Sequence, residues 1–448
     1  MSGNEPSALL IGADPYAIRA FLRNGITPVV LHSPQNNWGL FVNDWSHAPI
    51  PDSAELIFAE DPDNLESLLF SLHRAGAADR DYRCVQTNSE HGLVAAAALA
   101  NILGIRGPAP RTAVNFRDKW LQKQIVAAAG VTVARSRVVE DVYAPDPDAF
   151  TGFDVAVLKP IAGGGTRNTS VVRSTEEFLA TCAEYRRRRL PTRTFVLEEF
   201  IAGDEWVVEG VCFGGIIQFF CVGAYSAPCL SIVTEDAVMR GERFDPVADE
   251  PVYRLVAPLL ERALPALGLV DGVFHLELFH QAATGTVVFG ECAARRGGGL
   301  THEVVQCKFG VDLGEASVLC ALGTDPMIKP AVRPGVVGST FLATRPGVLV
   351  GYPSPEQIRQ LPGIEHVRLE LPFGSVVPDT TTTIQGVGQV VVTGDTRQEF
   401  RDRCDHLVRW FDERLIAVPT GASNQDLRTW QQTHWPQSAE FFRTYAGA

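Results

Sequence analysis

Two glutamates on neighbouring predicted strands could hold a divalent cation. Residues 271–300 contain two runs rich in Val, Phe and Leu on either side of a polar turn at Ala282–Gly285, which is typical of an antiparallel hairpin. Folding about this turn brings Glu277 nearly opposite Glu291. Facing carboxylates repel each other unless a cation lies between them, and carboxylate oxygens are ligands that Mg²⁺ prefers.

The same hairpin places further polar groups near the two glutamates. His275 shares a strand face with Glu277, and alternation puts Glu291 on the same face as Phe289. Arg295 and three glycines follow directly, which adds a fixed positive charge and a backbone that can approach a ligand closely. The simpler interpretation is a hairpin with two solvated glutamates and a glycine-rich turn.

A second glycine-rich segment is suited to covering phosphates. Residues 154–174 predict a strand that ends at Lys159, a loop with Gly163, Gly164 and Gly165, and another strand. Glycines allow backbone N–H groups to point at an anion, and the lysine supplies positive charge. The segment is not a Walker loop, because a strand and not a helix follows it. The alternative is a flexible hairpin tip.

Several acids lie beside apolar strands between residues 194 and 214. This stretch predicts a strand, a short connection that contains Ile201, and a second strand. The acids are Glu198 and Glu199 at the end of the first strand and Glu205 and Glu209 in the second. Acids in such positions indicate contact with a cation, a hydroxyl or an amine.

Composition limits the function classes. The chain has 448 residues, 46% of them hydrophobic, and a formal net charge of −13, which argues against a nucleic-acid surface. Nine cysteines without C-x-x-C spacing predict neither a disulfide framework nor a structural zinc site. No secretory signal or run of about 18 apolar residues is evident. We therefore expect a cytoplasmic protein that does not bind membranes.

The surrounding elements predict a multidomain protein of α/β and α+β type. Residues 8–12 form an apolar strand, followed by a helix that stops at Gly25 and a second strand, which is a Rossmann-like βαβ opening. It lacks a complete G-x-G-x-x-G and therefore a dinucleotide fingerprint. A helix over Asn115–Ala129 is expected to carry Asp118 in its first turn, with Lys119 beside it. A lysine in such a position is ordinarily solvated.

The breaks between these patterns divide the chain into four predicted units. They are a Rossmann-like domain at 1–110, a small unit at 111–193, a larger unit with the facing glutamates at 194–330, and a C-terminal α+β unit at 331–448. The run Thr380–Thr383 in the last unit is expected to be plain surface, the alternative being a loop near the site.

Taken in order, the motifs match one family. The chain resembles the ATP-grasp carboxylate–amine ligases, most nearly the branch of L-amino acid (dipeptide) ligases. The motifs that carry the resemblance are DK at 118–119, VLKPIAGGG at 157–165, VLEEFIAGDE at 196–205, FHLEL at 274–278 and ECAARRGGG at 291–299. The resemblance implies an ATP-grasp fold with a Rossmann-like N-terminal domain, a lid subdomain, a large subdomain and a C-terminal α+β extension.

The family's roles are implied for matching positions. Lys119 and Lys159 would hold the ATP phosphates under the loop Gly163–Gly165. Glu198, Glu199 and Ile201 would read adenine, largely through backbone groups, and Glu205 would take the ribose hydroxyls. Glu277 and Glu291 would bind Mg²⁺, with Mn²⁺ as an alternative, and Arg295 would steady the acyl phosphate. Many members have Glu-x-Asn at the second metal motif, but the third position here is Ala293, which leaves the number of metal ions open.

The implied reaction joins a carboxylate to an amine with release of ADP and phosphate. The expected substrates are amino acids or peptides, plausibly in peptide natural-product biosynthesis, and a homodimer is an option. Glu209 and His275 are candidates for amine contact or proton handling, although a packed strand histidine is the simpler interpretation. The alternatives are a biotin-carboxylase-like or purine-pathway ligase, a Rossmann dehydrogenase, and a nucleotide-binding protein without turnover.

Overall fold

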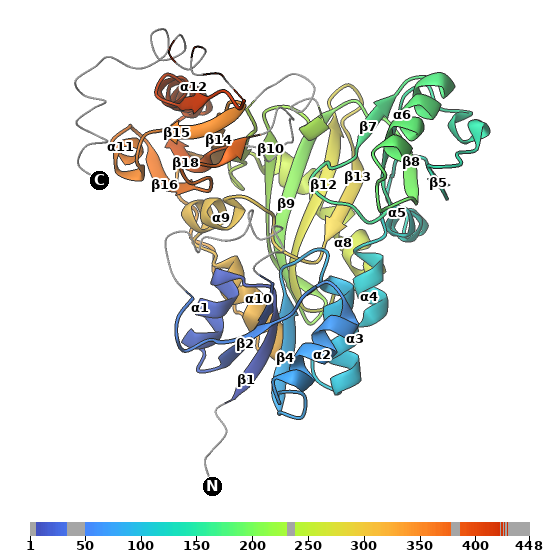
Figure 1. Cartoon of the computed structure of the whole chain (residues 1–448), viewed down its shortest axis with the longest axis vertical. Coiled ribbons are helices and arrows are strands. Elements are labelled where there is room, and N and C mark those ends of the chain that lie inside the picture. The colour runs from blue at the N-terminus through green and yellow to red at the C-terminus, as the bar shows by residue number, and fades with distance from the viewer. Residues whose placement is uncertain are drawn as a thin grey trace.

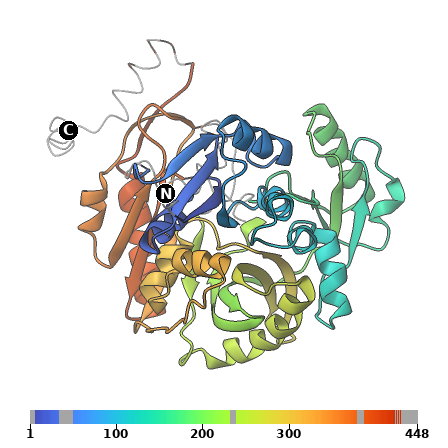
Figure 2. The same ribbon diagram turned by 90° about the horizontal axis from the view of Figure 1, so that it is seen from below.

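The computed structural model describes residues 6–33, 50–230, 238–377 and 386–421, with residues 423, 425 and 428 beyond them. The run Thr380–Thr383 lies outside these residues. In Figure 1 the long central strands separate three groups of elements, and in Figures 1 and 2 the small green sheet and the orange C-terminal strands lie on opposite sides of the molecule. Within the described ranges, no helix combines the length and the apolar run that crossing a membrane requires.

The N-terminal part is a four-stranded parallel sheet in the order β3-β2-β1-β4. Its elements are β1 (Ser7–Ile11), α1 (Pro15–Arg23), β2 (Thr27–His32), β3 (Glu55–Phe58), α2 (Leu65–Arg74), β4 (Tyr82–Thr87) and α3 (Leu93–Leu103). Strands β1 and β2 are almost continuous apolar runs, as expected of a parallel sheet that is covered on both faces. The predicted βαβ opening is confirmed.

The helix predicted over Asn115–Ala129 is two helices. They are α4 (Pro110–Asn115) and α5 (Lys119–Ala128), and Asp118 is the N-cap of the second. The Asp118 carboxylate accepts a hydrogen bond from the backbone N–H of Leu121 at 2.8 Å. A capping side chain satisfies a helix-end donor, so the new helix starts immediately after Asp118. The prediction of one helix with this acid in its first turn is therefore wrong.

A small antiparallel sheet in the order β5-β8-β6-β7 follows. Its elements are β5 (Ser136–Val139), the 3₁₀ helix η3 (Pro147–Phe150), β6 (Ala156–Pro160), β7 (Ser170–Val172), α6 (Thr175–Arg187) and β8 (Phe195–Glu199). The glycine loop connects β6 to β7, which pair antiparallel as predicted. Apolar residues of η3, α6 and the strands form a separate core behind the loop.

An eight-stranded sheet in the order β13-β12-β9-β10-β11-β14-β18-β16 dominates the molecule. The strands are β9 (Asp204–Phe213), β10 (Ile216–Tyr225), β11 (Arg240–Arg243), β12 (Gly272–Gln281), β13 (Thr286–Ala293), β14 (Val336–Leu342), β16 (Ile364–Leu369) and β18 (Gly388–Gly394). One face packs on α5 and α8 (Glu250–Leu267). Helices α9 (Thr301–Phe309) and α10 (Leu313–Leu322) cover the other face near the N-terminal sheet.

The C-terminal strands continue this large sheet. Strand β11 pairs with β14, so β14, β18 and β16 extend the sheet that carries the facing glutamates. The remaining elements are β15 (Gly347–Gly351), α11 (Pro355–Arg359), β17 (Val376–Val377), α12 (Arg397–Asp412) and β19 (Ile416–Val418). The mixed α/β and α+β class is confirmed, while the four domain boundaries stay predictions.

Candidate active site

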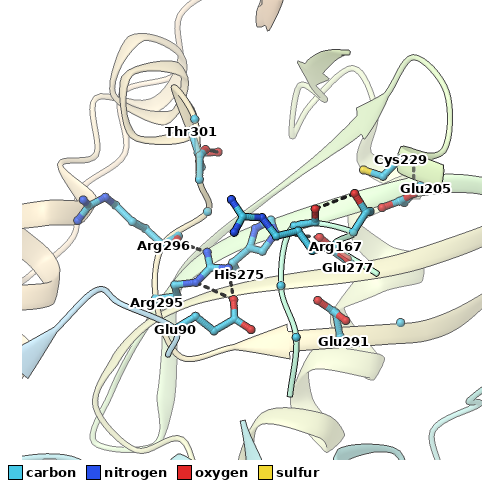
Figure 3. Close-up of a pocket in the computed structure, with 18 of the residues that line it drawn as sticks. Glu90, Arg167, Glu205, Cys229, His275, Glu277, Glu291, Arg295, Arg296 and Thr301 are labelled. Atoms are coloured by element: carbon cyan, nitrogen blue, oxygen red, sulfur yellow. Dashed lines mark hydrogen bonds and ion pairs between the residues drawn. The ribbon is translucent and has the colours of Figure 1, made fainter. Parts of the chain in front are cut away.

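A cavity of about 880 Å³ lies where the N-terminal sheet, the small sheet and the large sheet meet. All the predicted site residues line it except Glu209, which is buried behind His275. Figure 3 shows Glu205, His275, Glu277, Glu291 and Arg295 in this cavity. Residues that the motifs scatter over some 180 positions are therefore brought together.

The two glutamates of the hairpin are direct cross-strand partners, as predicted. The register shifts beside them, however, because Gly290 is an extra residue in β13. This β-bulge reverses the alternation, so Phe289 packs into the core opposite Leu278 while Glu291 faces the cavity. The predicted shared face of Glu291 and Phe289 is wrong for that reason. A Cβ at Gly290 would lie 2.8 Å from the carbonyl oxygen of Glu277, so the bulge needs glycine.

Lysines neutralise the carboxylate of Glu291. Lys119 Nζ lies 2.5 Å and Lys159 Nζ 3.8 Å from Glu291 Oε2. Burial raises the pKa of Glu291, but Lys119 and Lys159 outweigh burial and hold it well below its usual range. Lys119 is buried, so the interpretation of a solvated helix lysine is wrong.

A third lysine, which sequence reasoning missed, completes the network. Lys123 is only 1% exposed, lies 3.0 Å from Glu198 Oε1, and donates a hydrogen bond of 2.6 Å to the carbonyl oxygen of Gly290 in the bulge. Glu198 Oε2 in turn lies 2.9 Å from Lys159 Nζ. The signal for Lys123 was its spacing, because residues four apart lie on one helix face and Lys119 precedes it by four.

The end of β8 and the segment after it line the cavity. The Glu199 carboxylate turns outward and pairs with Arg135 at 3.0 Å, while Ile201 lines the cavity two residues later. Glu205 accepts a hydrogen bond of 2.8 Å from the backbone N–H of Cys229. Burial, together with the nearby charge of Glu277, raises the pKa of Glu205 to about 7.

His275 connects a buried acid to the first facing glutamate. Its Nδ1 lies 2.5 Å from Glu209 Oε1 and its Nε2 lies 3.3 Å from Glu277 Oε1. The other Glu209 oxygen accepts the backbone N–H of Gly297 at 2.9 Å. Burial lowers the pKa of His275, but Glu209 outweighs it and raises the pKa to about 10. Glu209 therefore orients both the histidine and the glycine-rich turn.

Arg295 is paired with Glu90, another residue that the sequence did not reveal. Arg295 donates to Glu90 through Nε at 3.1 Å and through Nη2, and Arg117 pairs with the other Glu90 oxygen at 2.7 Å. Burial raises the pKa of Glu90, but Arg295, Lys119 and Arg117 bring it down to about 2. Glu90 lies just beyond the carboxyl end of β4, where parallel sheets commonly bind ligands, and that position was its available signal.

Comparisons with known proteins find relatives in sequence and in fold. A sequence profile described as L-amino acid ligase C-terminal domain 2 matches residues 339–410. An L-arginine-specific L-amino acid ligase from Bacillus subtilis is 26% identical over 319 residues, which cover 70% of this chain and 75% of the relative.

Solved structures share the fold over almost the whole chain. The crystal structure of an L-amino acid ligase from Bacillus licheniformis superposes with a TM-score of 0.71 at 17% identity and covers 94% of this chain and 100% of its own. A carboxyaminoimidazole ribonucleotide synthase from Aspergillus clavatus, solved with ATP, superposes with a TM-score of 0.67 at 15% identity, covering 91% and 98%. The chain thus has the ATP-grasp fold, and its similarities in sequence and structure are to L-amino acid ligases.

Proposed function

We propose that this enzyme forms an amide bond between the carboxylate of an amino acid and an amine through an acyl phosphate. The observation that carries the proposal is the convergence of Lys119, Lys159, Glu277, Glu291 and Arg295 on one cavity. The volume of about 880 Å³ is at the upper end of ordinary ligand pockets, which suits a nucleotide together with a second substrate.

The lysine side of the cavity is proposed to bind ATP. Lys119 and Lys159 would exchange Glu291 for phosphate oxygens, under backbone N–H groups of Gly163–Gly165. The segment around Glu198, Glu199 and Ile201 would read adenine through its backbone, since both glutamate side chains already have cationic partners. Glu205 would accept the ribose hydroxyls.

Glu277 and Glu291 are proposed to hold Mg²⁺ or Mn²⁺. The residues fit, because two facing carboxylates offer the oxygen donors that such cations prefer. No group of three or more His, Cys, Asp and Glu in the described ranges could hold a metal ion, so phosphate oxygens and water would supply the other donors. When bound, the cation would neutralise charge on the polyphosphate.

The reaction is proposed to run in two steps. A carboxylate oxygen of the first substrate bonds to the γ-phosphorus as the bond to the bridging oxygen breaks and ADP leaves. The amine nitrogen of the second substrate then attacks the acyl carbon, the bond to the phosphate oxygen breaks, and phosphate leaves. Arg295 would stabilise the oxyanion of the intermediate. The attacking amine must shed a proton. His275, whose pKa of about 10 keeps it protonated at neutral pH, is proposed not to accept that proton; oriented by Glu209, it would contribute a fixed positive charge beside Glu277.

An amino acid is the proposed carboxylate substrate because one relative is named as an L-arginine-specific L-amino acid ligase. A place in peptide natural-product assembly would follow if both substrates are amino acids or short peptides. The sequence and the cavity leave the individual side chains open.

The test is a coupled ADP-release screen with MgATP and amino acids, singly and in pairs, with mass spectrometry of the products. The expected result is an ATP-dependent product whose mass equals two substrates minus water. ADP release with one acid and no condensed product would identify the acid and leave the amine to be found. If ATP binds but no acid causes ADP release, the result would contradict the proposed ligase function.

A further inference from the structure

We propose that Arg167 is a further catalytic residue, which binds the phosphoryl group as it passes from ATP to the substrate carboxylate. This inference rests on the proposed function. Arg167 follows the three glycines in the β6–β7 loop and lines the cavity. Figure 3 shows its side chain extending into the cavity, between Glu277 and Arg295 in that view.

The loop lies across the cavity against the N-terminal sheet. A Cβ placed on Gly164 would be 3.7 Å from Glu90 Oε2, the oxygen that pairs with Arg295. The base of the loop is fixed, because the carbonyl oxygen of Ile161 accepts the backbone N–H of Lys119 at 2.9 Å. Arg167 is three residues beyond Gly164, and its backbone N–H donates to the carbonyl oxygen of Gly164 at 3.5 Å, so this turn keeps Arg167 near the same wall of the cavity.

His91, a neighbour of Glu90, also lies in the cavity, and the charge of Arg167 affects its pKa. Burial and the charge of Arg117 lower the pKa of His91 to about 4, and the charge of Arg167 acts in the same direction. Arg167 and His91 both line the cavity, the first from the β6–β7 loop and the second from the segment after β4.

The backbone on both sides of Arg167 is held in an unusual conformation. Thr166 and Asn168 each have a φ of +54°, and they are two of the four non-glycine residues with positive φ in the described part of the chain. Such a conformation is unfavourable for a β-branched residue like threonine. Tyr185 on α6 secures the loop, because its hydroxyl donates to the carbonyl oxygen of Asn168 at 2.8 Å. Strained residues gather at active sites, where surrounding contacts maintain them.

The charges in the cavity leave a role for a second guanidinium. Arg295 already uses Nε and Nη2 on Glu90, and its Nη1 donates to the carbonyl oxygen of Arg296 at 2.8 Å. A transferring phosphoryl group spreads negative charge over three oxygens, and a planar guanidinium can donate two parallel hydrogen bonds to them. Arg167 would do this from the loop, opposite Arg295. It neither gains nor loses a proton, and the bonds change only at phosphorus.

The kinetic test compares Arg167→Met with Arg167→Lys and with Arg173→Met, which changes an exposed arginine directly after β7. Arg167→Met should lower kcat by roughly 10²–10³-fold, as expected when one transition-state donor is removed, and should change KM for ATP by less than about threefold. Arg167→Lys should recover part of the rate, and Arg173→Met should behave as wild type. A kcat within about threefold of wild type, or a loss confined to KM, would overturn the proposal.

A second test measures ligand binding by Arg167→Met and wild type without any turnover. The probe is MgADP with and without aluminium fluoride, which mimics the transferring phosphoryl group. Wild-type affinity for MgADP should rise on adding the fluoride, and Arg167→Met should keep its MgADP affinity but lose at least roughly tenfold of that gain. An equal gain in both proteins, or none in wild type, contradicts the role of Arg167. A normal gain without ADP release from any acid contradicts only the ligase function.

Discussion

Two groups of buried ion pairs border the cavity and are built differently. In the lysine half, made of Lys119, Lys123, Lys159, Glu198 and Glu291, each contact uses a single nitrogen. In the arginine half, made of Asp14, Glu90, Arg117, Arg295 and Arg296, the guanidinium groups clamp their carboxylates. An ammonium is a compact charge on a flexible stem, whereas a guanidinium is a planar fork.

This difference indicates which side chains can exchange their present ion-pair partners for the phosphates of a ligand. Glu291 is shared by Lys119 and Lys159, at 2.5 and 3.8 Å, so either lysine can turn to a phosphate without leaving the other charge alone. Arg296 instead binds both oxygens of Asp14 at 2.7 Å, and both residues are 3% exposed. We infer that the lysine half changes partners when ATP binds, and that the arginine half fastens the N-terminal sheet to the glycine-rich turn.

The largest expected effect comes from removing the shared carboxylate. Glu291→Gln should lower ATP-dependent ADP release by roughly 10³-fold or more, because the lysines lose their organising partner and the proposed metal site loses a ligand. The coupled ADP assay measures it. Glu184→Gln is the matched control, since its side chain pairs with Arg187 at the surface of α6, outside the cavity, and should leave turnover unchanged. Activity of Glu291→Gln within tenfold of wild type would contradict the role assigned to Glu291 in the lysine half.

The arginine half should show its effect in stability. Asp14→Asn removes the charge that compensates buried Arg296 and should lower the free energy of unfolding by about 3–4 kcal/mol. Urea denaturation monitored by circular dichroism measures the change. A loss below about 1 kcal/mol would mean that Arg296 finds other compensation, and that this half is no more fixed than the lysine half.

Acid should weaken the arginine half through Glu90. Its pKa falls from 4.5 to about 2 on folding, so the pairing contributes about 3 kcal/mol of stability above the unfolded pKa. That contribution is lost as pH falls through the folded pKa, mostly between about pH 5 and pH 2. Unfolding free energies of wild type and Glu90→Gln should therefore converge on acidification. Parallel curves over that range would contradict the assigned pKa.

Local patterns were sufficient to predict the hairpin. Alternation and a tight turn fix which residues oppose each other, so Glu277 and Glu291 were placed correctly. The bulge at Gly290 was not predicted, although its marks are present: a glycine inside the strand, and buried Phe289 and Cys292 three positions apart instead of two. The break before α5 was missed because the capping role of Asp118 competes with its ordinary place in a first helical turn.

The remaining misses depend on tertiary contacts. Glu90 and Arg295 are 205 residues apart, so their pairing exists only once the N-terminal sheet docks on the large sheet. The pairing of β11 with β14 is likewise decided between distant segments. Such contacts leave no pattern in the sequence. The order of the motifs can be read from the sequence, and that order identified the fold.

The smallest effect sharpens the comparison from within the lysine half. Lys123 is almost completely buried and holds both Glu198 and the bulge carbonyl of Gly290, so it should act as a fixed contact. Lys123→Met should lower the free energy of unfolding by about 2 kcal/mol, because two buried acceptors lose a donor while Glu198 keeps Lys159. Lys119→Met, one helical turn away, should weaken ATP binding with less loss of stability. Urea denaturation and MgATP titration of both variants measure the contrast. If Lys119→Met proved the more destabilising, Lys119 and not Lys123 would be the fixed contact of the lysine half.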